Sequence, residues 1–346
     1  MEAQGKPIGR VRPNRRGLEV DLAVIIVSWN VRDLLARCLR SVQASLAGAD
    51  LSWQIVVVDN ASSDGSAELV RQEFPEVRLL TLPENRGFAG GNNAALRALA
   101  LTPSPSSAPR ERARGWAVLL LNADAEAVGP AIPTLFAYLE GHPEVGVVGP
   151  QLCFPDGTVQ SSRRRFPTAG TLFWESTPLE QYWPGNPWAR RYHCRDRPDD
   201  VEQEVDWLVG ACLLVRAEAV QEAGLLDEGY FLYFEELEWL RRIGRAGWRV
   251  VYLPEARVIH HEGRSSEQVP LRRHLHFQRS KVRYARAALG PAWAGLLRLF
   301  LLAMYGWQWL VEGAKWMLGH RRALRRERMG IYAAVLRDGL AVKRGG

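Results

Sequence analysis

The sequence is poor in cysteine, and its four cysteines form no recognisable site. Cys38, Cys153, Cys194 and Cys212 lie far apart along the 346 residues, and no two of them make a CxxC pair. A zinc ribbon needs paired cysteines at short spacing, so that class of protein is excluded. The same scarcity argues against a disulfide framework and favours a reducing compartment.

Several other common signatures are missing. Residues 1–20 are rich in Gly, Pro and Arg and hold no apolar run typical of a secretory signal, so we expect a flexible basic leader. No repeat of fixed period is present. The glycine-rich segment Gly87–Gly91 matches neither GxGxxG nor GxxxxGK[ST]. We expect its glycines to let the backbone approach a ligand closely.

Charge of one sign gathers at one end of the chain. The formal net charge is +7, but residues 271–346 hold 16 Lys and Arg against 3 Asp and Glu, and the rest holds 29 against 35. A basic segment on a mildly acidic body favours contact with an anionic membrane surface. Nucleic acid is an alternative for this segment alone, and we expect no nucleic-acid partner for the protein.

Continuous apolar runs alternate with helical patterns in the first half. Such runs are typical of strands covered on both faces, and they lie at residues 22–27, 55–58, 77–80 and 116–121. Helical patterns lie between them, at residues 34–46, 67–73 and 94–100. We predict an α/β fold with a mostly parallel sheet flanked by helices and with ligands at the strand ends.

The second half has a different texture. A Pro-, Ser- and Arg-rich insertion at residues 102–115 precedes it, and residues 151–206 predict a loop-rich lobe over the sheet edge. Regular patterns resume with helices at residues 217–223 and 235–245 and a strand at residues 249–253. We place one domain at residues 21–270 and a basic, Trp-rich helical tail at residues 271–346.

Two aspartates stand at the ends of buried runs. Asp59, with Asn60 beside it, is suited to bind a nucleobase or ribose, and Asp124 is suited to bind a hard divalent cation. A turn aspartate that caps the next element is the alternative. Their occurrence on two strands favours a ligand site at this edge.

Further charged groups follow in the second half. Glu235 and Glu236 begin a helical pattern beside the aromatic run Tyr230–Phe234, where burial raises a carboxyl pKa toward that of a general base. A solvated helix start is the alternative. Adjacent His260 and His261 point to opposite sides of an extended strand, so at most one joins a given site.

Taken in order, these segments resemble the family 2 glycosyltransferases, which have the Rossmann-like GT-A fold, and in particular their bacterial rhamnosyltransferase-like branch. The resemblance covers residues 22–285 and rests on an ordered set of motifs, each weak alone: VIIVSWN at Val24–Asn30, VVVDNASSDG at Val56–Gly65, NRGFAGGN at Asn85–Asn92, LLLNAD at Leu119–Asp124, GACLLVR at Gly210–Arg216, GLLD at Gly224–Asp227, YFEELE at Tyr233–Glu238 and PEARVIHH at Pro254–His261.

The resemblance implies a nucleotide-sugar site. Asp59 would recognise the pyrimidine of a UDP- or dTDP-sugar, with Ser28 and Asn30 nearby. The remaining donor-binding residues implied are Asn60, Arg86, Gly87, Asn92 and Asn122.

The resemblance also implies a metal and a base. Asn122-Ala-Asp124 stands where the family has its DXD motif, so Asp124 would hold Mg²⁺ or Mn²⁺, and His260 or His261 would complete the site. Glu236 occupies the position of the family's catalytic Asp, with Glu235 as the fallback. The residues assigned to the acceptor or the diphosphate are Arg163, Arg164, Asp227 and Arg242. Arg163 and Arg164 are assigned from their place in the lobe above the sheet, where a solvated run is the alternative.

The function implied is inverting sugar transfer by direct displacement. The expected reaction moves rhamnose from dTDP-rhamnose to a lipid-linked or glycan acceptor in bacterial cell-envelope polysaccharide synthesis. A UDP-sugar donor carrying galactofuranose, GlcNAc or glucose is the alternative, as is a non-catalytic scaffold that binds nucleotide sugars.

The basic, Trp-rich tail indicates where in the cell the protein acts. Residues 292–311 form a mostly apolar stretch interrupted by Arg298 and Gln308, with tryptophans and flanking cations. This pattern favours a helix lying in the interface over one that spans the membrane. We therefore expect peripheral attachment to the cytoplasmic face of the bacterial inner membrane. A packed helical hairpin or an oligomer interface is the alternative.

Overall fold

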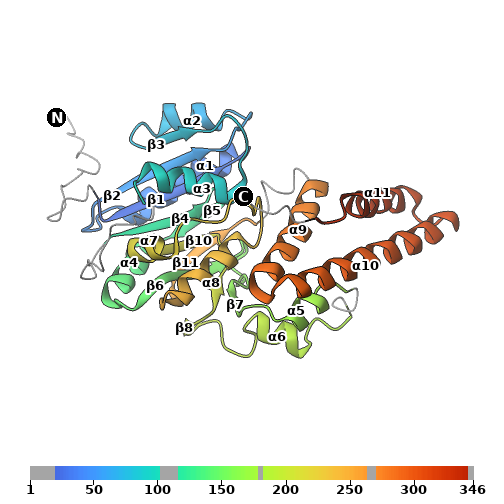
Figure 1. Ribbon diagram of the computed structural model, residues 1–346. Helices are drawn as coiled ribbons and strands as arrows, with labels where there is room; N and C mark the ends of the chain where they lie inside the picture. Colours follow the sequence, from blue (N-terminus) through green and yellow to red (C-terminus); the bar gives the residue numbers. More distant parts are fainter. Residues whose placement is uncertain (1–19, 102–115, 178–181, 263–269, 342–346) are drawn as a thin grey trace.

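The computed structural model describes residues 20–101, 116–177, 182–262 and 270–341 (Figure 1). The predicted leader and the 102–115 insertion therefore lie outside the described residues, except for Val20. The predicted α/β fold with a mostly parallel sheet flanked by helices is confirmed.

Nine strands form the main sheet, in the order β3-β2-β1-β4-β10-β6-β11-β5, with β8 paired to β11. Strands β1–β4 are mutually parallel where they pair, whereas β10 runs antiparallel to β4 and β6. The strands are β1 (Leu22–Ser28), β2 (Trp53–Asp59), β3 (Arg78–Thr81), β4 (Ala117–Asn122), β5 (Ala125–Val128), β6 (Val145–Cys153), β8 (Gln203–Glu204), β10 (Cys212–Arg216) and β11 (Arg249–His260). A separate pair joins β7 (Arg163–Arg164) to β9 (Trp207–Leu208).

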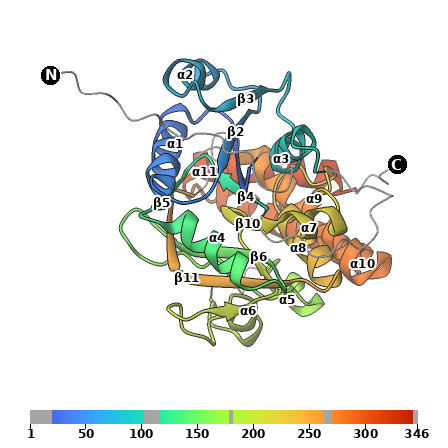
Figure 2. The same cartoon turned by 90° about the vertical axis from the view of Figure 1, so that its left-hand side faces the viewer.

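Helices cover both faces of the sheet (Figure 2). Side chains of β1 alternate between two cores: Leu22, Val24 and Ile26 pack into one, and Ala23 and Ile25 into the other. This is why β1 reads as a continuous apolar run. The helices are α1 (Arg32–Leu46), α2 (Ser66–Glu73), α3 (Gly87–Ala98), α4 (Ala131–Gly141), α5 (Ala169–Trp174), α6 (Pro187–Tyr192), α7 (Ala217–Ala223), α8 (Glu235–Arg245), α9 (Pro270–Leu289), α10 (Pro291–Met317) and α11 (Arg322–Asp338).

The helix expected at residues 94–100 was placed wrongly. It begins at Gly87, at the start of the glycine-rich segment Gly87–Gly91. The glycines allow close packing: a Cβ on Gly91 would lie 2.6 Å from Cγ1 of Val27 on β1, and one on Gly87 would collide with the carbonyl oxygen of Phe231. The expectation that these glycines face a ligand is therefore corrected, because protein atoms fill the space beside them.

The tail packs onto the loop that follows α7 in the sheet domain. On α9, His276 stacks on Phe231 with ring centroids 4.4 Å apart, and Arg283 pairs with Asp227 at 2.8 Å. Figure 1 shows α10 and α11 as two helices that project from the body beyond α9. The domain boundary at residue 270 stays a prediction, and the packing runs across it.

Candidate active site

Two polar side chains meet at the ends of β1 and β2. Ser28 and Asp59 are paired in the parallel register, and both are buried. Asp59 Oδ2 accepts a hydrogen bond from the Ser62 backbone N–H at 3.2 Å. Ser28 Oγ and Asp59 Oδ1 have no hydrogen-bond partner among the described residues. Buried polar atoms are costly to leave unpaired, so these two are suited to a ligand that brings donors and acceptors.

The two asparagines predicted beside them shape the loops. Asn30 adopts a left-handed backbone, with φ of 51°, and its Oδ1 accepts the Ser63 N–H at 2.8 Å. Asn60 donates to Asn85 Oδ1 and to the Gly87 carbonyl, both at 3.0 Å, and accepts from the Arg86 N–H at 2.9 Å. Asn60 therefore holds the start of α3 in place.

Other residues predicted to bind the donor are engaged at α3. Arg86 pairs with Glu228 at 2.6 Å, and Asn92 donates to the Phe88 carbonyl at 3.0 Å. Glu228 also binds Arg97 and Asn93. Burial acts to raise the pKa of Glu228, but hydrogen bonds from Asn93 and Arg97 outweigh it and lower that pKa. These contacts fix α3 against the loop that follows α7.

A candidate metal site lies where β4 ends beside β11. His260 Nε2 lies 3.4 Å from Asp124 Oδ1 and 3.3 Å from Asn122 Nδ2. Its Nδ1 lies 2.9 Å from Gln160 Oε1, and Gln160 Nε2 donates to Glu262 at 2.7 Å. A carboxylate only accepts, so the amide NH₂ of Gln160 faces Glu262 and its oxygen faces His260. Nδ1 is therefore the donor to Gln160, and Nε2 is the ring nitrogen that faces Asp124.

His261 points elsewhere. Its Nε2 lies 2.7 Å from Glu126 Oε1, while its backbone N–H donates to the Asp124 carbonyl. Of the two histidines, His260 is thus the one whose ring faces Asp124. No group of three or more His, Cys, Asp or Glu side chains surrounds a point in the described ranges. Two facing lone-pair ligands fit a divalent cation that takes its remaining ligands from a diphosphate.

The two glutamates follow an unusual turn. Tyr233 and Phe234 both have left-handed backbones, with φ of 67° and 69°. Such strain in bulky residues is found at functional sites. It places Glu235 and Glu236 at the first turn of α8, where each has one buried carboxylate oxygen without a partner among the described residues.

Burial sets the protonation of this pair. Burial, followed by the neighbouring charge of Glu236, raises the pKa of Glu235 well above its ordinary value. Burial also raises the pKa of Glu236, while backbone N–H donors, including that of Gly210, and the charge of Arg164 oppose the rise. A carboxylate with a raised pKa that stays partly exposed is suited to accept a proton.

The candidate base and the candidate metal ligands lie at the same edge of the sheet. Glu236 contacts the Gly210 N–H, and the next residue, Ala211, accepts the Asn122 N–H at 2.9 Å through its carbonyl. Asn122 in turn contacts His260. The pairing of β10 with β4 therefore brings together groups that lie more than 100 residues apart in the sequence.

The four residues assigned to acceptor or diphosphate differ in placement. Arg242 donates to Glu238 at 3.0 Å and to the Leu225 carbonyl at 2.8 Å. The carboxylate of Asp227 accepts hydrogen bonds from the guanidinium of Arg283. Arg163 is buried, with its guanidinium on the Pro198 carbonyl and Asp199. These three are engaged within the fold, which does not favour ligand contact. Arg164 alone directs its charge at Glu236.

Sequence reasoning missed several supporting residues. Gln160 and Glu262 orient His260, and Asn93 joins Glu228 to the Leu226 backbone. None belongs to a spacing pattern that links it to its partner, because the contacts bridge 100 residues or more. Only the resemblance of the surrounding motifs pointed to this region.

Comparison with known proteins identifies the family. Residues 23–222 match the model of "Glycosyl transferase family 2". Over 251 residues the chain is 34% identical to the N-acetylglucosaminyl-diphospho-decaprenol L-rhamnosyltransferase of Mycobacterium tuberculosis, covering 72% of this chain and 78% of that protein. It is 36% identical over 74 residues to the rhamnosyltransferase WbbL of Escherichia coli, covering 20% and 28%.

One solved structure is similar over nearly the whole chain. It is the mannosyltransferase PcManGT of Pyrobaculum calidifontis in complex with GDP-Man and Mn²⁺, at a TM-score of 0.47 and 18% identity, covering 98% of this chain and 90% of that one. The family match spans more than half of this chain, and the mycobacterial relative shares a third of its aligned residues. The chain belongs to glycosyl transferase family 2 and, within it, to the rhamnosyltransferase-like enzymes.

Proposed function

We propose that the protein transfers a sugar, best assigned as rhamnose from dTDP-rhamnose, to a hydroxyl of a lipid-linked or glycan acceptor in bacterial cell-envelope polysaccharide synthesis. The observation that carries this is Glu236, a partly buried carboxylate next to Gly210, at the edge that also bears Asn122, Asp124 and His260. The name of the mycobacterial relative supports both the sugar and the lipid-linked acceptor.

Glu236 is the proposed base. It accepts the proton of the acceptor hydroxyl as that oxygen attacks the anomeric carbon from the side opposite the diphosphate, so the configuration inverts. Because its pKa is raised, the carboxylate of Glu236 binds the proton more strongly than an exposed glutamate does. General base catalysis typically raises the rate about 10²–10⁴-fold. Arg164, which favours the ionised form, keeps the carboxylate available.

The donor lies along the strand ends in this proposal. Ser28 Oγ and Asp59 Oδ1 are buried atoms without a partner among the described residues, and they bind the nucleobase and ribose of the donor. Asp124 and His260 are the residues that hold Mg²⁺ or Mn²⁺. When bound, such an ion neutralises charge on the departing diphosphate. A donor carrying galactofuranose, GlcNAc or glucose on UDP fits the same nucleotide contacts.

The protein is proposed to sit on the cytoplasmic face of the inner membrane through α10. By length and composition α10 could span a membrane, and it is the one such helix in the described ranges. Its buried side faces α9 and α11, through residues such as Leu297, Leu301 and Tyr305. The opposite side is also apolar and exposed, and it consists of Trp293, Leu296, Leu299, Trp307 and Leu310.

The polar interruptions of α10 do not fall on that exposed side. Arg298 turns inward and donates to the Gly339 carbonyl at 2.5 Å. Gln308 lies at about 120° from Leu296 at 100° per residue, toward the buried side. Exposed Arg321, Arg322 and Arg326 follow the end of the helix. An uninterrupted apolar face beside cations favours a helix lying in the plane of an anionic leaflet.

Donor hydrolysis tests the proposal. Purified protein is incubated with a panel of UDP-, dTDP- and GDP-sugars, with Mn²⁺ or EDTA, alongside Asp124→Ala. We expect slow release of nucleotide diphosphate from one donor, abolished by EDTA and by the substitution. Hydrolysis of no donor together with no nucleotide binding would overturn the proposal and favour the non-catalytic scaffold.

A further inference from the structure

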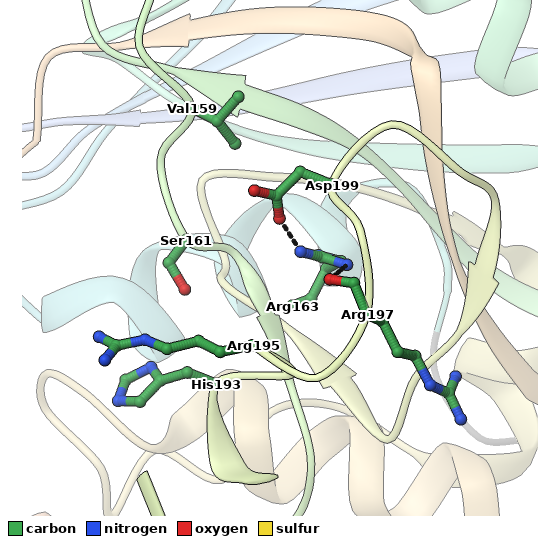
Figure 3. A pocket seen from close by; sticks show the side chains of 7 residues that line it. All are labelled: Val159, Ser161, Arg163, His193, Arg195, Arg197 and Asp199. Atoms are coloured by element: carbon green, nitrogen blue, oxygen red, sulfur yellow. Dashed lines mark hydrogen bonds and ion pairs between the residues drawn. The ribbon is translucent and has the colours of Figure 1, made fainter. Parts of the chain in front are cut away.

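A pocket lies in the lobe between β6 and β10, and of its lining residues only Arg163 and Asp199 have been described above. It encloses about 230 Å³ and is lined by Val159, Ser161, Arg163, His193, Arg195, Arg197 and Asp199 (Figure 3). Six of these seven residues are polar, and three are arginines. Such a lining favours an anionic polar ligand over an apolar one.

The three arginines that line the pocket differ in their ion pairs. Arg163 pairs with Asp199, the one carboxylate among the lining residues, and Arg197 points its guanidinium away from the group in Figure 3. Arg195 lies beside His193 and donates to the Pro184 carbonyl at 3.1 Å. Within the described ranges no carboxylate pairs with Arg195. The pocket therefore offers one guanidinium whose charge is not balanced there.

His193 adds an unmet hydrogen-bonding group. Its Nδ1 is buried and has no partner among the described residues. Burial, together with the charges of Arg164 and Arg195, lowers the pKa of His193 to about 3, so the ring is neutral at physiological pH. A neutral ring can carry its proton on Nδ1 and donate it to an anion held by Arg195.

The pocket adjoins the proposed base through Arg164. Arg164 Nη1 donates to Ser161 Oγ at 2.9 Å, and its charge acts on Glu236. Ser161 and Arg164 are three residues apart, which is at most about 10 Å of extended chain. Gln160, next to Ser161, contacts His260 of the candidate metal site. The segment from Val159 to Arg164 thus lines the pocket, contacts His260 through Gln160 and carries the arginine whose charge acts on Glu236.

The same lobe adjoins the helix proposed to meet the membrane. Phe173 on α5 contacts Trp293 and Phe300 on α10, with ring centroids 6.3 Å and 5.2 Å apart. Four of the lining residues, His193, Arg195, Arg197 and Asp199, follow α6, which packs on α5. The pocket is therefore connected to α10 through α6 and α5.

We propose that this pocket binds the diphosphate of a lipid-diphosphate-linked sugar acceptor and so presents the sugar hydroxyl to Glu236. The inference rests on the proposed function for its acceptor class. Arg195, His193 and Ser161 form the anion-binding set. Arginine forks match phosphate oxygens, and charge-assisted hydrogen bonds are about twice as strong as neutral ones.

Direct binding tests the proposal without turnover. Inorganic pyrophosphate is titrated by calorimetry into the full chain in EDTA, with dTDP saturating the nucleotide site. We expect Arg195→Gln to weaken pyrophosphate binding about tenfold, the loss typical of one charged hydrogen bond. The control is Arg190→Gln, an exposed arginine on the neighbouring α6 that does not line the pocket. Equal affinity in wild type and Arg195→Gln, or no binding at all, would overturn the proposal.

A second measurement separates the acceptor from a free phosphate. A short-chain GlcNAc-diphospho-lipid is titrated in the same way, next to GlcNAc on the same lipid without the diphosphate. We expect binding that needs the diphosphate, is displaced by pyrophosphate and is weakened by Arg195→Gln and His193→Phe. Pyrophosphate binding that leaves acceptor affinity unchanged would mean a free-anion site and refute the acceptor assignment. These titrations measure binding and not turnover. A failure of the donor-hydrolysis experiment would therefore contradict the proposed function and leave the assignment of this pocket to be judged by binding.

Discussion

His260 Nε2 faces Asp124 Oδ1 at 3.4 Å, and the far side of the same ring is held by Gln160 at 2.9 Å. This relationship joins the end of β4 to the end of β11 and distinguishes the two adjacent histidines. Only His260 is oriented toward the carboxylate, because His261 is bound to Glu126. The orientation depends on a glutamine that itself is fixed by Glu262.

Substitution of Gln160 should weaken metal binding. Residues that orient a metal-binding histidine typically contribute 10–100-fold to affinity, so we expect a loss of that size in Gln160→Leu. Titration of Mn²⁺ followed by electron paramagnetic resonance measures it in the presence of nucleotide diphosphate. His260→Gln should lose binding, and the matched His261→Gln should retain it. Retention by His260→Gln with loss by His261→Gln would reverse the assignment.

The pH dependence of transfer should follow the buried glutamate pair. Burial raises the pKa of Glu236, and the base acts only when ionised, so kcat/KM should rise with pH through an apparent pKa above about 4.3, the ordinary glutamate value. Because Glu235 and Glu236 interact, the limb belongs to the pair rather than to one residue. A rate profile flat between pH 4.5 and pH 8 would contradict this reading.

Glu235 should limit stability at neutral pH. Its pKa in the folded protein is raised well above the unfolded value, so folding favours the protonated form. The stabilising contribution is present below the unfolded pKa and is lost as pH rises through the folded pKa. Glu235→Gln, which stays neutral, should therefore be more stable than the wild type at high pH by about 1–3 kcal/mol. Urea midpoints measured from pH 5 to pH 9 check this, and a gap that narrows as pH rises would oppose it.

The exposed face of α10 should control membrane binding. Leu299 and Leu310 are 65% and 59% exposed, so replacing both with Glu should release the protein from anionic vesicles without unfolding it. Val201→Glu, at an exposed apolar position in the lobe, is the control. Sedimentation with vesicles measures the bound fraction. Release by the control as well, or by neither variant, would argue against this face.

The sequence was sufficient for the sheet because its signals are local. The continuous apolar run of β1 marks a strand covered on both faces, and Asp59 stands at the end of β2 beside Ser28. The helices at residues 217–223 and 235–245 were predicted with the observed bounds. Each of these features depends on residues within one element or its cap.

The rest depended on contacts between distant segments. Helix α3 can start at Gly87 because its glycines have no side chain where Val27 and the Phe231 backbone approach. The spacing of the glycines in the sequence does not reveal these neighbours. Likewise, the sequence could not choose between His260 and His261, since the choice is made by Gln160, 100 residues away. Arg242 looked available in the sequence, but the fold directs it to Glu238 and to backbone carbonyls.

The most direct test of the account is transfer by wild type and Glu236→Gln. Rhamnose transfer from dTDP-rhamnose to a short-chain GlcNAc-diphospho-lipid is followed by mass spectrometry, and the anomeric configuration of the product by NMR. The account predicts an inverted product from the wild type and a kcat lower by about 10²–10⁴-fold in Glu236→Gln, with donor affinity unchanged. Near-normal turnover by Glu236→Gln, or a product with retained configuration, would contradict it.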